Sequence, residues 1–428
     1  MRNDRPENGS RREEPACYIW ITHIKFNYDE SSLSNDAFNI RIDQLHDVPV
    51  PEWDQSKFRP EESPAAYAIK ETAGHTVYIQ CRFEMDPASA AATATVKATG
   101  GGILGAIDPI TVNFVNGVSH DASHPGNQEY VQIPLRHRKF SAITREDISW
   151  EWLYKCPHSH VWHPMDIRTH HRIYVVLEQP PLPWSQTDAQ RYPWTSALDY
   201  AIVSANTRGL SDAREAAARV VQHVNGEPLQ YDIWGGRPFY YAGGFGGGTF
   251  MIAAWLAGFI NGPIVNCYDC ASAVTTFSNV LGCHLTYQFH GPFGYLDPVY
   301  PIGRGLCNNP FYGLRAAPYN VPLVGVDDAG RTSFGNHAYS KQAGNNYDAC
   351  MRGAPGCATA LAYYILGLLI LILSLGAAAT LAHLLFMRAA GFLVDLSQPD
   401  YESITLDTST PAEALRDGGA PVPEALSI

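Results

Sequence analysis

The sequence has few charged residues, and their balance is acidic. Asp, Glu, Lys and Arg make up 17% of the 428 residues, and the formal net charge at pH 7 is −12. No basic stripe is present that would neutralise the phosphates of a nucleic acid. We therefore expect no nucleic-acid partner.

Cysteine is also scarce for a chain of this length. Nine cysteines are too few for a disulfide-stapled scaffold, and an odd number leaves at least one thiol unpaired. The first sixteen residues, MRNDRPENGSRREEPA, lack the apolar run of a secretory signal. We expect residues 1–16 to form a disordered polar tail.

Charge is absent altogether from Gly353 to Met387, and LAYYILGLLILILSLGAAATLAHLLF within this stretch is nearly all apolar. About 20 such residues cross the hydrocarbon core of a bilayer. A helix buried in a large domain is the alternative, but such helices rarely run this long without a polar face. The sequence therefore predicts a single transmembrane helix over residues 358–387.

The flanks of this predicted helix give little information on orientation, because Arg352 and Arg388 lie on opposite sides of it. Since no signal sequence is found, we expect a single-pass membrane protein with its body on the cytoplasmic side. The acidic, Ser-, Thr- and Pro-containing residues 388–428 predict a disordered tail.

The first half of the chain contains runs of alternating polarity. In TVYIQCRFEM, residues 76–85, apolar and polar side chains alternate, which is typical of a half-buried antiparallel strand. Similar runs recur as far as HRIYVVLEQP, with turn residues and no long helix between them. A chain of 428 residues also exceeds what one core ordinarily supports. We therefore predict a separate antiparallel, immunoglobulin-like β-sandwich over residues 17–180.

Beyond residue 184 the apolar residues recur at helical spacing. TSALDYAIVSANTRG predicts one helix, and Ser211 is the predicted N-cap of the next. The stretch YYAGGFGGGTF is rich in glycine but lacks the Gly-Lys-Ser/Thr of a phosphate-binding loop. It predicts a flexible loop or lid.

Two cysteines lie three residues apart in VNCYDCASAVTTFSNVLGC, residues 265–283. The pattern predicts a helix that begins at Cys267, is capped by Asn266 and ends at Gly282. Free backbone N–H groups and the helix dipole stabilise a thiolate in a first turn, so Cys267 is the candidate nucleophile. Cys270 lies a turn further along and faces the core. Zinc binding by the pair would need a second pair of ligands, and no second Cys-x-x-Cys is present.

A thiolate nucleophile needs a base and a group that orients the base. RTSFGNHAYSKQAGNNYDACMR supplies His337 in one strand-like run and Asp348 in the next, joined by the turn AGNN. Two antiparallel strands here would put the imidazole and the carboxylate side by side.

Three motifs in this order resemble those of the transglutaminase-like superfamily: Cys267-x-Asp269-x-Ala271, Asn336-His337-Ala338 and Tyr347-Asp348. The resemblance covers about residues 184–350. It implies a papain-like catalytic core over residues 184–352, in which Cys267 is the nucleophile, His337 the general base and acid, and Asp348 the residue that fixes the tautomer of His337. The expected fold class is α+β: an N-terminal antiparallel β-sandwich, then the transglutaminase-like core, then one transmembrane helix.

These residues predict an enzyme that transfers an acyl group from a protein or peptide amide through a thioester. Water as acceptor would make it a protease or amidase, and an amine would make it a cross-linking enzyme. Hydrolysis is favoured because nothing marks an amine site. The oxyanion hole would use the backbone N–H of Cys267 and a second donor that the sequence does not identify. The alternative is a membrane-tethered, non-catalytic binding protein that retains the same fold.

Other candidate sites are weaker. Cys307, in a Gly- and Asn-rich loop, is a second candidate for a reactive thiol. A histidine cluster can ligate a transition metal, but no carboxylate pattern accompanies it, and surface or inter-domain histidines are the alternative. Its members are His158, His160, His163, His170 and His171. The pair Asp327-Asp328 lies in no recognisable calcium loop. We expect no metal and no cofactor.

Overall fold

The computed structural model describes residues 17–28, 35–88, 92–124, 126–157, 159–232, 237–244, 246–259, 264–290, 295–296, 299–302, 336–353, 406–407 and 422–428. The chain divides into two compact units. Met1–Asn39, Val48–Ser141 and Arg145–Val175 belong to unit 1, and Ile40–Asp47, Ala142–Thr144 and Val176–Ile428 belong to unit 2.

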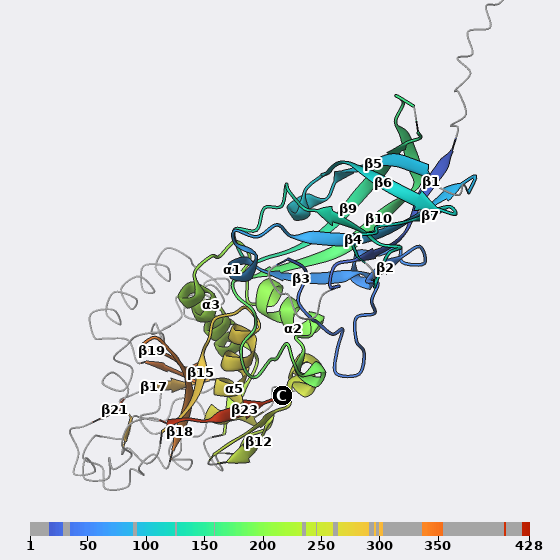
Figure 1. Cartoon of the computed structure of the whole chain (residues 1–428). Helices are drawn as coiled ribbons and strands as arrows, with labels where there is room; N and C mark the ends of the chain where they lie inside the picture. Colours follow the sequence, from blue (N-terminus) through green and yellow to red (C-terminus); the bar gives the residue numbers. More distant parts are fainter. Residues whose placement is uncertain are drawn as a thin grey trace, which may run out of the picture. The chain divides into compact units, whose positions relative to one another are not determined.

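Unit 1 is built on one continuous sheet (Figure 1). In the described part of the chain its strands follow the order β2-β1-β4-β7-β6-β5-β9-β10-β3, and β8 pairs with β4. The strands are β1 (Tyr18–Lys25), β2 (Trp53–Asp54), β3 (Pro64–Ala68), β4 (Tyr78–Asp86), β5 (Ala92–Gly100), β6 (Ile107–Val115), β7 (Val118–Ser119), β8 (Val131–Pro134), β9 (Thr144–Lys155) and β10 (His163–Val176). Short helical segments lie at Pro60–Glu62, Ile69–Thr72 (α1) and Gly102–Leu104.

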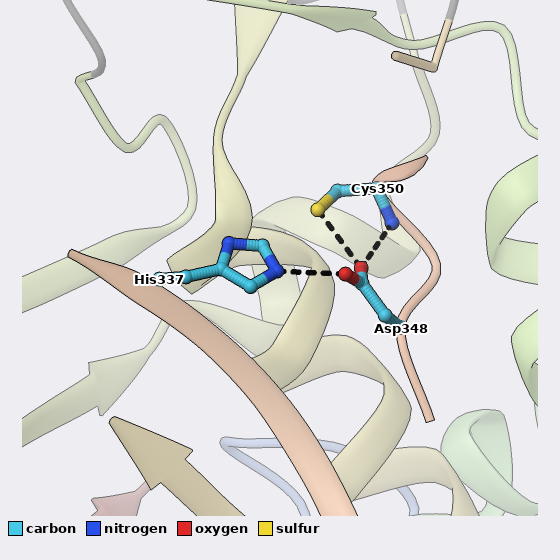
Figure 2. A group of neighbouring side chains, drawn as sticks. All are labelled: His337, Asp348 and Cys350. Carbon is cyan, nitrogen blue, oxygen red and sulfur yellow. Dashed lines mark hydrogen bonds and ion pairs between the residues drawn. The ribbon is translucent and has the colours of Figure 1, made fainter. Parts of the chain in front are cut away.

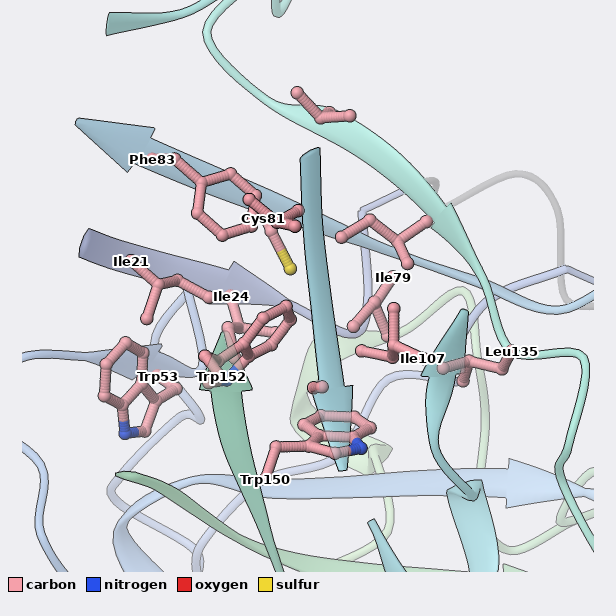
Figure 3. Close-up of a cluster of buried hydrophobic side chains, with 14 of the residues drawn as sticks. Ile21, Ile24, Trp53, Ile79, Cys81, Phe83, Ile107, Leu135, Trp150 and Trp152 are labelled. Carbon is pink, nitrogen blue, oxygen red and sulfur yellow. The ribbon is translucent and has the colours of Figure 1, made fainter. Parts of the chain in front are cut away.

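The apolar face of this sheet surrounds one hydrophobic core. β1 and β4 pair antiparallel, with Ile24 opposite Cys81. Side chains from these strands meet the indole rings of Trp150 and Trp152 from β9 (Figure 3). All of these side chains are at most 1% exposed. Because burial of one large apolar side chain contributes about 1.5–3 kcal/mol, this face holds the unit together.

The immunoglobulin-like sandwich predicted for residues 17–180 is wrong. A sandwich contains two separate sheets that face each other, whereas here the strands are hydrogen-bonded along one path. A long twisted sheet buries its own apolar face by curling. Alternating polarity puts apolar side chains on one face of a strand in both architectures, so the alternation does not distinguish between them.

Unit 2 combines short strands with few helices. Its helices are α2 (Thr195–Asp199), which continues into a π-helical turn (Tyr200–Ser204), α3 (Ala213–Gly226), α4 (Ile252–Leu256) and α5 (Cys267–Asn279), with a short 3₁₀ turn at Ala189–Arg191. Its strands are β11 (Gln230–Tyr231), β12 (Tyr241–Gly244), β13 (Gly247–Phe250), β14 (Ile264–Val265), β15 (Thr286–His290), β16 (Tyr295–Leu296), β17 (Val299–Pro301), β18 (His337–Gln342), β19 (Asn345–Tyr347), β20 (Met351–Gly353), β21 (Leu406–Asp407), β22 (Val422–Pro423) and β23 (Ala425–Ser427).

Helix α5 is the centre of unit 2. It contacts α3 as well as β15 and β18 of the sheet β19-β18-β15-β22. Its residues other than Tyr268 are buried, which is typical of a helix surrounded by other elements. Helix α3 begins after Asp212, whose carboxylate accepts hydrogen bonds from the backbone N–H groups of Arg214 and Glu215. The N-cap is therefore Asp212 and not the predicted Ser211.

The predicted end of the chain also needs correction. Within the described ranges no helix combines the length and apolar character needed to cross a bilayer, and residues 358–387 lie outside those ranges. β21 pairs with β16, and β22 pairs with β15. Described strands that precede and follow residues 358–387 are therefore paired with each other, while the predicted membrane helix itself lies outside the described residues and stays a prediction. The same pairings order two segments of residues 388–428, a range predicted to be disordered.

A candidate Cys-His-Asp site

Cys267 is the first residue of α5, as the sequence predicts. The side-chain oxygen of Asn266 accepts hydrogen bonds from the backbone N–H groups of Tyr268 (3.0 Å) and Asp269 (3.4 Å). The carboxylate of Asp269 in turn accepts from the backbone N–H of Asn266 at 3.0 Å. This reciprocal capping fixes the first turn of the helix. Cys267 is only 1% exposed.

The predicted hairpin that carries His337 and Asp348 is confirmed. β18 and β19 pair antiparallel, and the two residues between them, Ala343 and Gly344, have φ values of 46° and 86°. Positive φ at both positions is the geometry of a type I′ hairpin turn. His337 begins β18, and Asp348 directly follows β19.

The His337 ring and the Asp348 carboxylate form a buried pair (Figure 2). The Nε2 atom of His337 lies 2.7 Å from Oδ2 of Asp348, and both side chains are 1% exposed. Since an ionised carboxylate only accepts, Nε2 carries the hydrogen in this contact. The other ring nitrogen, Nδ1, remains for a second partner.

Two sets of hydrogen bonds hold this hairpin to the surrounding helices. The Ser340 hydroxyl donates to the carbonyl of Ala271 at 3.1 Å and lies 2.8 Å from the hydroxyl of Thr275, so β18 is fixed against α5. At the end of α3, Asn225 donates to the carbonyl of Ala349 at 2.7 Å. The strand that bears His337 and the segment that bears Asp348 are therefore positioned independently.

The charge on Asp348 controls the protonation of His337. Burial alone would lower the pKa of His337, but the Asp348 carboxylate and hydrogen bonds to Asp348 and Cys267 outweigh it and raise the pKa to about 10. A hydrogen bond between His337 and Cys267 brings the third predicted residue into the group. The structure thus brings together Cys267, His337 and Asp348, with the imidazole hydrogen-bonded to both of the other side chains.

Tyr231 belongs to the same site and is not among the residues that the sequence indicates. Its pKa is raised by burial, by the charge of Cys267 and by a hydrogen bond to Cys267. β11 pairs in parallel with β14, with Tyr231 opposite Val265, two residues before the cysteine. A tyrosine in a two-residue strand has no local signal, so only the strand pairing could reveal it.

Cys350 is hydrogen-bonded to Asp348, and Cys270 is hydrogen-bonded to Cys350. Oδ1 of Asp348 accepts hydrogen bonds from the backbone N–H and the thiol of Cys350, each at 2.9 Å. The thiols of Cys270 and Cys350 are also hydrogen-bonded to each other, and both are fully buried. One carboxylate oxygen of Asp348 therefore serves His337, and the other is held by Cys350.

The same group offers one possible set of metal ligands. Ligating atoms of His337, Asp348 and Cys350 lie within 4.8 Å of one another, and nitrogen, oxygen and sulfur donors suit zinc. A cation bound there would displace the hydrogen bond between His337 and Asp348. The sequence-based expectation of no metal remains a prediction.

The other candidate sites do not form such a group. His171 is buried in unit 1, where its Nδ1 lies 2.9 Å from the Ser63 hydroxyl. In the part of the chain that the structure describes, no three-ligand group contains a member of the histidine cluster. His158, Cys307, Asp327 and Asp328 lie outside the described residues.

Comparisons with known proteins give little further information. No family model and no curated protein matches the sequence. The chain is similar to a crystal structure of red sea bream transglutaminase, with 11% sequence identity and a TM-score of 0.25. The match covers 63% of this chain and 47% of the other, so this chain spans about half of that length. A likeness this weak carries no argument about the site, whose chemistry must be inferred from its own geometry.

Proposed function

We propose that the protein transfers acyl groups from a protein or peptide amide through a thioester on Cys267. One observation carries the proposal: the buried imidazole of His337 is hydrogen-bonded both to the Asp348 carboxylate and to the side chain of Cys267. A thiol, a base and an orienting carboxylate in this order are the parts that nucleophilic acyl transfer requires.

In the resting site the thiol proton of Cys267 has already passed to Nδ1 of His337, and the sulfur then attacks the amide carbon of the substrate. The raised pKa of His337 favours the resulting imidazolium beside a thiolate. The tetrahedral intermediate carries its negative charge on the former carbonyl oxygen. The backbone N–H of Cys267 and the phenol of Tyr231 are the donors that we assign to this oxyanion.

Collapse of this intermediate breaks the carbon–nitrogen bond. His337 gives its proton to the departing nitrogen, which leaves as ammonia or an amine, and a thioester remains on Cys267. In the second step His337 takes a proton from the acceptor as the acceptor attacks the thioester. Water yields a carboxylic acid and an amine yields a new amide, and in both cases the Cys267 thiolate departs beside the protonated His337. We favour water, because no feature of the chain marks an amine site.

The test is to trap the thioester. Full-length protein is incubated with a panel of peptide amides and examined by intact-protein mass spectrometry after acid quenching. We expect a mass increase equal to the acyl group, which Cys267→Ala abolishes. Cys283→Ala is the matched control, because Cys283 is also fully buried but does not belong to the triad. If no adduct forms, or if the adduct persists in Cys267→Ala, the proposal is wrong.

One observation favours the non-catalytic alternative. Cys267 is 1% exposed, so a substrate reaches the sulfur only after neighbouring side chains move. The rate of alkylation by iodoacetamide in the native protein separates the two functions. An enzyme requires Cys267 to react at least as fast as an ordinary exposed thiol. A binding protein with a permanently closed site leaves Cys267 unreactive until the chain unfolds.

A further inference from the structure

The segment Val422–Ile428, called here the 422–428 segment, is paired with two different sheets of unit 2. Pro423 lies opposite Gln288 and Val422 opposite Phe289 in an antiparallel pairing of β22 with β15. Two residues later, β23 pairs in parallel with β13, with Ala425 opposite Gly247. The segment therefore occupies two strand edges, and β23 lies beside the hairpin β12–β13 (Figure 1).

Backbone groups and two polar side chains make its contacts. The backbone N–H of Glu424 donates to the carbonyl of Tyr287 at 3.0 Å. The backbone N–H of Gly246 donates to Oε1 of Glu424 at 2.7 Å. At the other end, the Ser427 hydroxyl lies 2.7 Å from that of Thr249 and donates to the carbonyl of Gly248. This is the pattern by which a sheet edge recognises an extended peptide.

Within the glycine-rich stretch, β13 is the strand whose edge pairs with the segment. A Cβ atom on Gly247 would lie 2.2 Å from the carbonyl oxygen of Ala425, and Gly247 has a φ of 110°. A side chain at this position is therefore excluded by the segment as well as by the backbone. Gly246 has a similar φ of 96°, but a Cβ there meets no atom within 4 Å. The absence of a side chain at Gly247 therefore lets the backbone of another strand approach closely.

The segment also lies next to the candidate site. Tyr268 follows Cys267 in the chain, and the Tyr241 ring stacks on that of Tyr287 at 5.9 Å. The Tyr268 ring stacks on that of Tyr241 at 5.2 Å. Tyr287, whose carbonyl accepts from Glu424, has a pKa raised by burial, by Tyr241 and by Cys267. One aromatic cluster therefore connects the segment with the sulfur.

A cavity of about 390 Å³ adjoins the segment. The residues that line it include Leu182, Pro183 and Leu285 as well as Leu426 of the segment. Glu424 and Leu426–Ile428 are only partly buried, and Pro423 and Ala425 are exposed. The occupant is thus held mainly by its backbone and has unfilled space beside it, which suits an occupant that can be exchanged.

We infer that the edges of β13 and β15 form a binding site for extended peptides, and that the 422–428 segment is its intramolecular occupant. The favoured ligand has an acidic residue followed by a small residue, as in Glu424-Ala425. This inference rests on the proposed function, because it makes such peptides the substrates that reach Cys267. Displacement of the segment is then part of substrate binding.

The probe is the fluorescein-labelled peptide Val-Pro-Glu-Ala-Leu-Ser-Ile, whose binding to the full-length protein is measured by fluorescence anisotropy. Glu424→Lys weakens the internal competitor, so we expect the peptide to bind this variant at least about tenfold more tightly than the unaltered chain. Adding Gly247→Ala to that variant should abolish binding. Adding Gly246→Ala instead should preserve binding, because Ala at 246 is similarly strained in its backbone but does not clash with the bound peptide.

The inference is overturned if Glu424→Lys does not increase the affinity, or if the two glycine variants bind equally. Circular dichroism of each variant checks that it is folded. A second arm compares kcat/KM for a peptide amide carrying the Glu-Ala-Leu-Ser sequence with that for a small acyl donor without it. Glu424→Lys should raise only the former. If the peptide binds as expected but no variant forms a thioester, the proposed function fails while the peptide site stands.

Discussion

At the scale of single residues, His337 determines how the site responds to pH. Its pKa in the folded protein is about 10, compared with an ordinary value of 6.5. The folded state therefore binds the imidazolium proton more tightly than the unfolded state does. The contribution of this group to stability is complete below pH 6.5 and is lost as the pH rises through about 10.

Activity should follow the same group. We expect kcat/KM to fall as the pH rises through about 10, because neutral His337 has no proton to give to the leaving nitrogen.

Asp348→Asn removes the charge that raises this pKa, so the fall should begin at a lower pH. We also expect kcat to drop about 10³- to 10⁴-fold, as loss of an orienting carboxylate does in other triads. A pH–rate profile of both proteins is the measurement. An alkaline limb at the same pH in both would contradict the assigned role of Asp348.

Cys350 should act as a positioning residue for Asp348. Its thiol donates to the carboxylate oxygen that does not face His337. Cys350→Ala removes this donor, and we expect kcat to fall about tenfold, because a hydrogen bond to a charged group contributes about 1.5 kcal/mol. Cys350→Ser keeps a donor and should restore most of the rate. Equal rates in the two variants, with equal thermal stability, would exclude a positioning role for the thiol.

At the scale of elements, the sequence predicts the helix start and the hairpin correctly, because neighbouring residues determine both. The start of α5 at Cys267 follows from Asn266 and the spacing of apolar residues, and the hairpin of His337 and Asp348 follows from two short runs and a turn. The 422–428 segment lacks such a signal, because its order comes from the edges of β13 and β15. Tyr231 was missed for the same reason. Pairing between distant segments cannot be read from spacing.

The β18–β19 turn offers a test of this local control. Ala343 has a φ of 46°, which is strained for a residue with a Cβ atom, and Asn tolerates this region well. We expect Ala343→Asn to raise the free energy of unfolding by up to about 1 kcal/mol. Gly344→Ala should lower it by a similar amount although the space around Gly344 is open, because its φ is 86°. Urea unfolding measures both, and changes of the same sign would contradict the assigned turn.

At the scale of the whole molecule, the sequence-based interpretation failed where the arrangement depends on several distant segments at once. One curled sheet and two facing sheets both require strands of alternating polarity. The alternation therefore did not determine which of the two architectures forms. The apolar stretch that predicts a membrane crossing lies outside the described residues, and nothing in its sequence indicated that strand pairs join the segments on both sides of it. A disulfide joins Cys17 and Cys156, a pairing across unit 1 that the spacing of the cysteines did not indicate.

That disulfide provides the last prediction. It joins residues 139 positions apart, just before β1 and just after β9, and so restricts a large part of unit 1 in the unfolded chain. We expect the double variant Cys17→Ser/Cys156→Ser to lose about 3–5 kcal/mol in the unfolding of unit 1. Reduction with dithiothreitol should lower the melting temperature of the unaltered protein but not that of the double variant. Alkylation of Cys267 in unit 2 should proceed at an unchanged rate, measured below the transition. A melting temperature that is insensitive to both changes would show that the curled sheet is stable without this covalent bond.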